Sequence, residues 1–279
     1  MILWAISDLH VHFAENRAAL GRLPMLREDW LAIAGDVAET EDQLAQTFEL
    51  LRPKFGKLFW APGNHELWTR PRRSGLRGRA KYERLLQICR AHDVVTPEDP
   101  YQDWPGPGRY RIAPLLVLYD YSFRPDSVTV EGAVQWARDG GAHCLDEVLL
   151  NAEPYESVAA WCRERVRYTE ARLADAASRD DRALILVNHY PLRAEDVRLR
   201  RIPRFSIWCG TRATADWHRR FRARVVVSGH LHVRGTSYAD GCRFEEVSLG
   251  YPDDWQTQLG VQPYLRQILP EPEPRCERT

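Results

Sequence analysis

Side chains of the types that bind transition metals stand in short polar clusters of this sequence, and each cluster directly follows an apolar run. Carboxylate, amide and imidazole ligands together suit a divalent transition metal better than they suit Ca²⁺ or Mg²⁺ alone. We therefore expect a site for a divalent transition metal. The clusters are Asp8-Leu9-His10, Gly35-Asp36, Gly63-Asn64-His65-Glu66, Asn188-His189 and Gly229-His230-Leu231-His232.

The composition of these clusters suits a pair of metal ions about 3.5–4 Å apart, in which each ion has its own ligands and one carboxylate bridges both. Asp8 and His10 alternate and can bind one ion, and Asp36 stands alone as the natural bridge. Two cations lower the pKa of a bound water, so that a metal-bridging hydroxide can act as the nucleophile. The side chains that would complete the two shells are Asn64, His189, His230 and His232.

His65 remains after these ligands are assigned, beside the expected site. A histidine in this position can protonate a leaving oxygen. Glu66, the next residue, either orients His65 or caps a helix. The glycines that precede Asp36, Asn64 and His230 permit tight turns and a close approach of the backbone.

The apolar runs before the clusters are typical of buried strands. In open α/β sheets, ligands bind at the carboxyl ends of the strands, where these clusters stand. The runs are Ile2–Ile6, Trp30–Ala34, Lys57–Ala61, Ala183–Val187 and Arg224–Val227.

Other segments complete a pattern of strands and helices that indicates a layered α/β fold. We expect strands at Arg111–Leu118 and Cys242–Leu249, and a loop from Pro97 to Gly108. We expect helices at Glu39–Lys54, Ala80–His92, Pro154–Ala177 and Thr214–Arg222, the third with its proline in the first turn.

Taken together and in order from residue 8 to residue 232, the clusters resemble the signature blocks of the calcineurin-like metallophosphoesterase superfamily. The resemblance implies a four-layer α/β/β/α sandwich with two central mixed sheets. It also implies that His65 is the general acid. One metal ion would be held by Asp8, His10, Asp36 and His232, and the other by Asp36, Asn64, His189 and His230. Manganese, iron and zinc all accept this shell, so the sequence leaves the metals open.

Several segments are similar to a narrower group, the phosphopantetheinyl hydrolases. The resemblance implies a phosphodiesterase that cleaves the bond between 4′-phosphopantetheine and a serine of a holo carrier protein. The segments are Trp4–His10, Gly63–Trp68, Leu118–Phe123, Trp208–Thr211 and Phe244–Pro252.

Other functions remain open at this point. A phosphomonoesterase or nucleotide hydrolase acting on a small metabolite is the main alternative. A nuclease is less favoured, because 39 basic and 39 acidic residues give a net charge of zero. A non-catalytic scaffold should lack metal ligands, and none is missing here.

An arginine-rich stretch offers a binding surface for an acidic acyl or peptidyl carrier protein, because guanidinium groups pair well with carboxylates. The substrate-binding candidates are Arg70, Arg72, Arg73 and Arg77. A second cluster comprises Arg193, Arg198, Arg200, Arg201 and Arg204.

We expect one metallophosphoesterase domain from residue 1 to residue 269, with a cap-like insertion at roughly 67–180 and a disordered tail at 270–279. The sequence shows no secretory leader and no membrane span, so we expect no membrane partner. The six cysteines form no close pair. These features predict a cytoplasmic protein.

Overall fold

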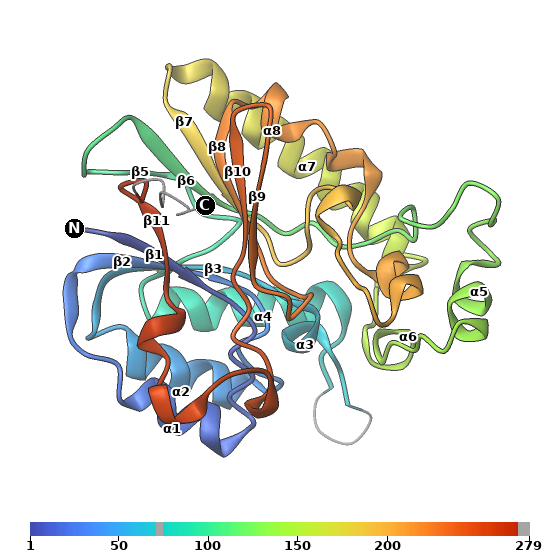
Figure 1. Cartoon of the computed structure of the whole chain (residues 1–279), viewed down its shortest axis with the longest axis horizontal. Helices are drawn as coiled ribbons and strands as arrows, with labels where there is room; N and C mark the ends of the chain where they lie inside the picture. Colours follow the sequence, from blue (N-terminus) through green and yellow to red (C-terminus); the bar gives the residue numbers. More distant parts are fainter. Residues whose placement is uncertain (71–74, 273–279) are drawn as a thin grey trace, which may run out of the picture.

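Two β-sheets stack face to face at the centre of the computed structural model, which describes residues 1–70 and 75–272 (Figure 1). The strands of the first sheet, in spatial order, are β11 (Arg266–Leu269), β1 (Leu3–Ile6), β2 (Leu26–Ala34), β3 (Phe55–Ala61) and β4 (Val94–Val95). Those of the second are β5 (Gln102–Asp103), β6 (Tyr110–Pro114), β7 (Ala183–Val187), β8 (Ala223–Ser228), β10 (Cys242–Glu246) and β9 (Gly235–Ala239).

Both sheets are mixed. β1 to β4 run parallel and β11 pairs antiparallel with β1, whereas β6, β7, β8 and β10 run parallel between antiparallel β5 and β9. The space between the sheets is filled by one apolar cluster, with small residues such as Ala32 and Ala34 facing Val187 and Val225. Burial on both faces explains why the parallel strands read as continuous apolar runs.

Helices cover the outer face of each sheet and complete the expected α/β/β/α sandwich (Figure 1). Below the first sheet lie α1 (Ala14–Gly21), α2 (Glu41–Leu51) and α4 (Gly78–Ala91), and above the second lie α7 (Val158–Arg179) and α8 (Trp217–Arg220). The shorter helices are α3 (Asn64–Leu67), α5 (Ala133–Asp139) and α6 (Asp146–Leu149). The 3₁₀ helices are η1 (Ala194–Asp196), η2 (Pro203–Trp208), η3 (Arg212–Thr214), η4 (Pro252–Asp254), η5 (Thr257–Leu259) and η6 (Gln262–Tyr264). None of the described helices is long and apolar enough to cross a membrane.

The five apolar runs form strands as expected, but several predicted boundaries are wrong. The strand expected at Arg111–Leu118 ends at Pro114, because the side chain of Asn188 takes over the backbone hydrogen bonds of Val117. The long helix begins at Val158 rather than at Pro154, because the Ser157 hydroxyl accepts a hydrogen bond from the Ala160 amide and caps the helix.

Three other boundaries also differ from the expectation. The strand at Cys242–Leu249 ends at Glu246, and the expected loop at Pro97–Gly108 contains the two-residue strand β5. The helix expected at Thr214–Arg222 is only the single turn of α8, preceded by η3.

The described residues of the stretch 67–180 do not form a separate cap. This stretch supplies β4 to the first sheet, β5 and β6 to the second, and α4 and α7 to the outer layers. Among its described residues, the middle part, with α5 and α6, projects from the sheets (Figure 1). The expectation rested on the distance between His65 and His189, and the two-residue strands within it carry no recognisable pattern.

The predicted tail begins with residues that are held in place. Glu271 accepts hydrogen bonds from both the Nε and Nη2 atoms of Arg224, at 2.6 and 2.9 Å. Residues 273–279 lie outside the described part of the chain.

Candidate active site

The polar clusters come together because they follow β1, β2, β3, β7 and β8, whose carboxyl ends meet at one edge of the sandwich. Backbone hydrogen bonds join the clusters to one another. The amide of Asp8 donates to the Gly35 carbonyl at 2.9 Å, and the amide of His10 donates to the Asp36 carbonyl at 3.0 Å. The loops after the first two strands are therefore fixed relative to each other.

Five of the predicted ligands have backbone conformations that non-glycine residues rarely adopt. Their φ angles are +54° for Asp8, +42° for His10, +53° for Asp36, +73° for His230 and +52° for His232. Such strained residues persist only where the surrounding structure holds them, and they concentrate at functional sites.

Two glycines allow this close packing of loops. A Cβ atom on Gly35, which has a φ of +85°, would lie 2.6 Å from the Gly63 nitrogen and from Nδ1 of His189. A Cβ atom on Gly63 would lie 2.1 Å from Oδ1 of Asp36. Glycine is therefore required before Asp36 and before Asn64.

The donor atoms form three overlapping groups, within each of which they lie no more than 4.8 Å apart. Asp36 belongs to two of the groups, one on the side of His10 and one on the side of His189. Its Oδ2 atom lies 3.4 Å from Nε2 of His189. The groups are Asp8, His10 and His232; His10, Asp36 and His65; and Asp36, His189 and His230.

Asn64 and His189 are oriented by residues behind them. Nδ1 of His189 lies 2.9 Å from the Ala34 carbonyl oxygen, so that Nε2 points into the site. The Nδ2 atom of Asn64 donates to Asp146 at 2.9 Å, which leaves its Oδ1 atom 3.0 Å from Nε2 of His189. Asp146 was missed in the sequence because nothing in its neighbourhood marks it.

The electrostatics of the site fit bound cations. Burial raises the pKa of Asp36, and the negative charges of Glu66 and Asp8 raise it further. Burial lowers the pKa of His10 and of His230. Nδ1 of His230 lies 3.2 Å from Nε2 of His189, so that this nitrogen faces the donor group that also contains Asp36.

His65 lies beside Asp36, with its Nε2 atom 3.7 Å from Oδ2 of that residue. Its ring packs on Trp68, and its Nδ1 atom lies 3.5 Å from Oε1 of Glu39. Burial lowers the pKa of His65, whereas Glu39 acts to raise it. In return, contact with His65 lowers the pKa of Glu39 to about 2. Glu39 was missed in the sequence, although it lies in the same loop as Asp36.

Glu66 supports the site without touching the imidazole of His65. Its carboxylate accepts hydrogen bonds from the amides of Asp36 at 3.0 Å, Val37 at 2.8 Å and Gly63 at 3.0 Å. The capping interpretation of this residue is therefore the one that the structure supports.

An open cleft leads to the donor atoms. Besides several of those residues, its lining contains six further side chains, of which Trp68 and Tyr251 lie in segments that the sequence already marks. The six are Trp68, His143, Cys144, Leu145, Phe205 and Tyr251.

The predicted substrate-binding arginines are only partly described. Arg70 forms an ion pair with Glu39, and Arg77 lies 3.9 Å from Glu153. Arg72 and Arg73 lie outside the described residues. A role of these four residues in substrate binding stays a prediction.

The sequence of this chain is similar to those of known phosphoesterases. The sequence profile of calcineurin-like phosphoesterases matches residues 1–234. The acyl-carrier-protein phosphodiesterase PptH of Mycobacterium tuberculosis (strain ATCC 25618 / H37Rv) is 45% identical over 97% of this chain and 84% of its own length.

The PptH crystal structure agrees with the sequence comparison. This structure of phosphopantetheinyl hydrolase from Mycobacterium tuberculosis superposes with a TM-score of 0.90 and 44% identity, over 97% of this chain and 96% of that chain. The protein TT1561 of Thermus thermophilus is more distant, with 13% identity and a TM-score of 0.49 over 89% of this chain and 90% of that chain.

Proposed function

Because the chain belongs to the calcineurin-like phosphoesterase family and is a metal-dependent hydrolase of phosphoric esters, we propose that it removes 4′-phosphopantetheine from a holo carrier protein. The observation that carries this proposal is the likeness to PptH along nearly the whole chain, at a TM-score of 0.90. The similarity to PptH covers 97% of this chain, and so extends well beyond the polar clusters that calcineurin-like phosphoesterases share.

Contacts between two group-specific segments support the proposal. Leu118–Phe123 and Trp208–Thr211 are far apart in the sequence, yet the Thr211 hydroxyl donates to Asp120 at 2.8 Å. The backbone amide of Arg212 also donates to the Ser122 hydroxyl at 2.8 Å. The two segments thus form one structural unit beside the cleft that Phe205 lines.

We assign two metal ions to the donor groups described above. Asp8, His10, Asp36 and His232 would hold one ion, and Asp36, Asn64, His189 and His230 would hold the other. Such a pair supplies a hydroxide nucleophile at neutral pH and neutralises charge on the phosphoryl oxygens. The mixed oxygen and nitrogen ligands accept manganese, iron or zinc.

The protein itself supplies the proton for the leaving group. The serine oxygen of a carrier protein is a poor leaving group, because it departs as an alkoxide unless it is protonated. Nε2 of His65 lies on the side of the cleft next to Asp36 and can deliver that proton. Glu39 positions His65, because it faces Nδ1 and restricts rotation of the ring.

We also propose that residues 1–269 act as one domain in the cytoplasm. The five described cysteines are free thiols, which is typical of a reducing compartment.

A side-by-side assay tests the substrate proposal. The metal-loaded enzyme is incubated with a holo carrier protein, with a small phosphodiester and with a phosphomonoester. We expect release of phosphopantetheine from the carrier and hydrolysis of the diester. Turnover of the monoester without any release from the carrier would instead favour a small-metabolite phosphatase.

A further inference from the structure

The chemistry of the proposed substrate restricts where its protein part can lie. In a phosphopantetheinylated serine, only Oγ and Cβ separate the phosphorus from the main chain of the carrier protein. The phosphorus must reach the donor atoms at the base of the cleft. The surface of the carrier must therefore contact the residues that surround the cleft mouth.

Helix α6 and the residue that precedes it present two exposed apolar side chains at this mouth. Leu145, which lines the cleft, is 61% exposed, and Val148 is 72% exposed. They are three residues apart and so share one face of the helix. Contiguous exposed apolar surface that is rimmed by polar residues marks interaction sites.

Asp146 and Glu147, the two residues between them, bond α6 to its surroundings. Asp146 accepts the hydrogen bond from Asn64 at 2.9 Å. Glu147 accepts hydrogen bonds from the Trp208 indole at 2.6 Å and the Tyr121 hydroxyl at 2.9 Å. Helix α6, which carries Val148 and follows Leu145, is therefore hydrogen-bonded directly to the predicted metal ligand Asn64.

A basic segment, Leu199–Phe205, lies on the same side of the cleft, and Phe205 lines the cleft together with Leu145. Arg200 and Arg201 are exposed, and neither has a carboxylate within 4.0 Å in the described part of the chain. Arg204 ties the segment to α5, because its guanidinium donates to the Trp136 carbonyl at 2.7 Å. Figure 1 shows this segment beside the part of the chain that contains α5 and α6.

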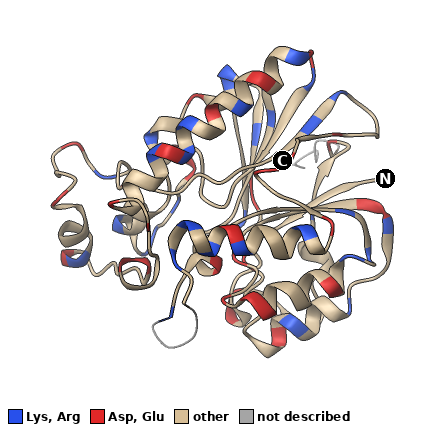
Figure 2. Ribbon diagram, turned by 180° about the vertical axis from the view of Figure 1, so that it is seen from behind, with Lys and Arg blue, Asp and Glu red and all other residues tan. Residues whose placement is uncertain are grey.

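Several other basic residues already form ion pairs with acidic residues of this chain. Arg79 pairs with Glu83 at 2.9 Å, and Arg84 pairs with Glu41 at 3.1 Å. Basic and acidic residues are intermixed along the helices in the same way (Figure 2).

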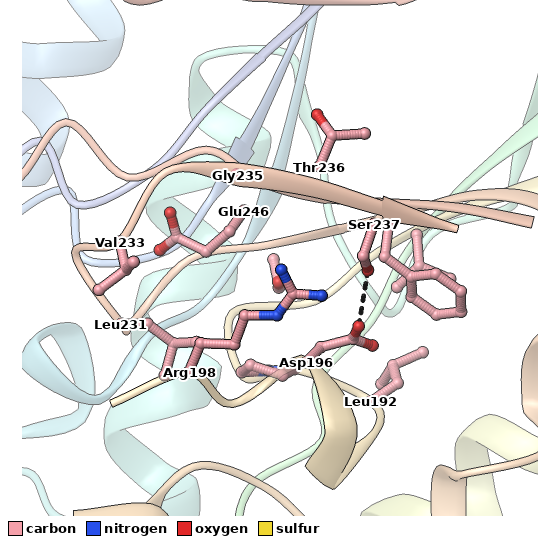
Figure 3. Close-up of a pocket in the computed structure, with 13 residues that line it drawn as sticks. Leu192, Asp196, Arg198, Leu231, Val233, Gly235, Thr236, Ser237 and Glu246 are labelled. Carbon is pink, nitrogen blue, oxygen red and sulfur yellow. Dashed lines mark hydrogen bonds between the residues drawn. The ribbon is translucent and has the colours of Figure 1, made fainter. Parts of the chain in front are cut away.

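Arg198 precedes the basic segment but does not extend its surface. In Figure 3 its side chain lies in a pocket between Asp196 and Glu246, where Asp196 also accepts a hydrogen bond from Ser237 at 2.8 Å. Its charge therefore faces acidic groups of this chain, unlike those of Arg200 and Arg201.

We infer that α6 with Leu145 and the Leu199–Phe205 segment form the docking surface for the carrier protein, an inference that rests on the proposed function. The partner face is acidic around the modified serine, to pair with Arg200 and Arg201. It also has an apolar side chain that packs on Leu145 and Val148. Docking there places the serine over the cleft mouth.

Two sets of variants test this surface, Arg200→Glu with Arg201→Glu, and Val148→Ser alone. For each, KM for a holo carrier protein should rise by about tenfold, whereas hydrolysis of bis(p-nitrophenyl) phosphate should stay unchanged. The double variant should also lose most of the salt dependence of carrier turnover, because exposed charges mainly set the association rate. Arg163→Glu with Arg167→Glu is the matched control, since both residues are exposed on α7, and no described carboxylate lies within 4.0 Å of either guanidinium.

Three results would overturn the docking surface. They are an unchanged KM in both sets, an equal loss on both substrates, and an equal rise of KM in the α7 control. Failure of the wild-type enzyme to release phosphopantetheine from any holo carrier would instead remove the proposed function on which the inference rests.

Discussion

The side-chain amide of Asn64 donates a hydrogen bond to Asp146 at 2.9 Å, across 82 positions of sequence. Asp146 is buried and also accepts a hydrogen bond from the Trp68 indole at 2.6 Å. This arrangement directs the Asn64 carbonyl oxygen toward His189. A predicted metal ligand is thus oriented by a residue from the projecting part of the chain.

Asp146→Ala should weaken metal binding, because Asn64 would lose the partner that fixes its orientation. Loss of such an outer contact typically costs about 10–100-fold in metal affinity. Metal retained after dialysis against graded chelator concentrations measures the effect. Asp139→Ala is the control, since that carboxylate is exposed and accepts a hydrogen bond from Gln135 at 2.7 Å, within the same short helix. Identical retention in the two variants would show that Asp146 does not support the site.

His65→Gln should keep the metal ions but slow hydrolysis of an alkyl phosphodiester by about 10²–10⁴-fold, because general acid catalysis is lost. The loss should be much smaller for a p-nitrophenyl ester, whose leaving group needs no proton. Glu39→Gln should show the same dependence on the leaving group with a smaller loss. If good and poor leaving groups slow equally, His65 is not the acid.

Gly35→Ala should destabilise the protein by at least about 2 kcal/mol. The new Cβ atom would lie 2.6 Å from the Gly63 nitrogen, at a φ of +85°. Gly21→Ala is the matched control, because its Cβ atom would have no neighbour within 4 Å, and it should be neutral or more stable by up to about 1 kcal/mol. Thermal denaturation of the metal-free proteins gives both values, and equal stability would contradict the close loop packing.

Glu98 should contribute to stability in a pH-dependent way. Burial acts to raise its pKa, but Arg165 at 2.7 Å and the hydroxyls of Tyr168 and Tyr82 lower it below the usual value of 4.5. A carboxylate whose pKa is lower in the folded state stabilises the protein above the unfolded pKa and loses that contribution as the pH falls through the folded pKa.

Glu98→Gln should therefore cost about 1–3 kcal/mol at pH 7 and reduce the loss of stability below about pH 4.5. Denaturant titrations of the metal-free proteins between pH 7 and pH 3 test this. Parallel stability curves for the wild type and the variant would show that Glu98 does not titrate as described.

The strands that carry the site were predictable because continuous apolar runs end in clusters such as Asp8-Leu9-His10. Glu39 and Asp146 were not predictable, because each acts through contacts that exist only after distant segments meet. The dependence on tertiary contacts also explains why residues 67–180 were wrongly expected to form a cap-like insertion. The two-residue strand β4 has no periodicity, and its place in the first sheet comes from pairing with β3. Local pattern thus identified the donor atoms, and tertiary packing determined what orients them.

Asp36 lies between two donor groups, and elemental analysis measures whether its carboxylate joins two metal ions. The purified wild-type protein should contain two transition-metal ions per chain. Asp36→Asn should lose most of both, because one carboxylate joins the two groups and the neutral amide cannot replace it. Fully active wild-type protein with a single metal ion, or an Asp36→Asn variant that keeps both ions, would contradict the bridged dinuclear centre.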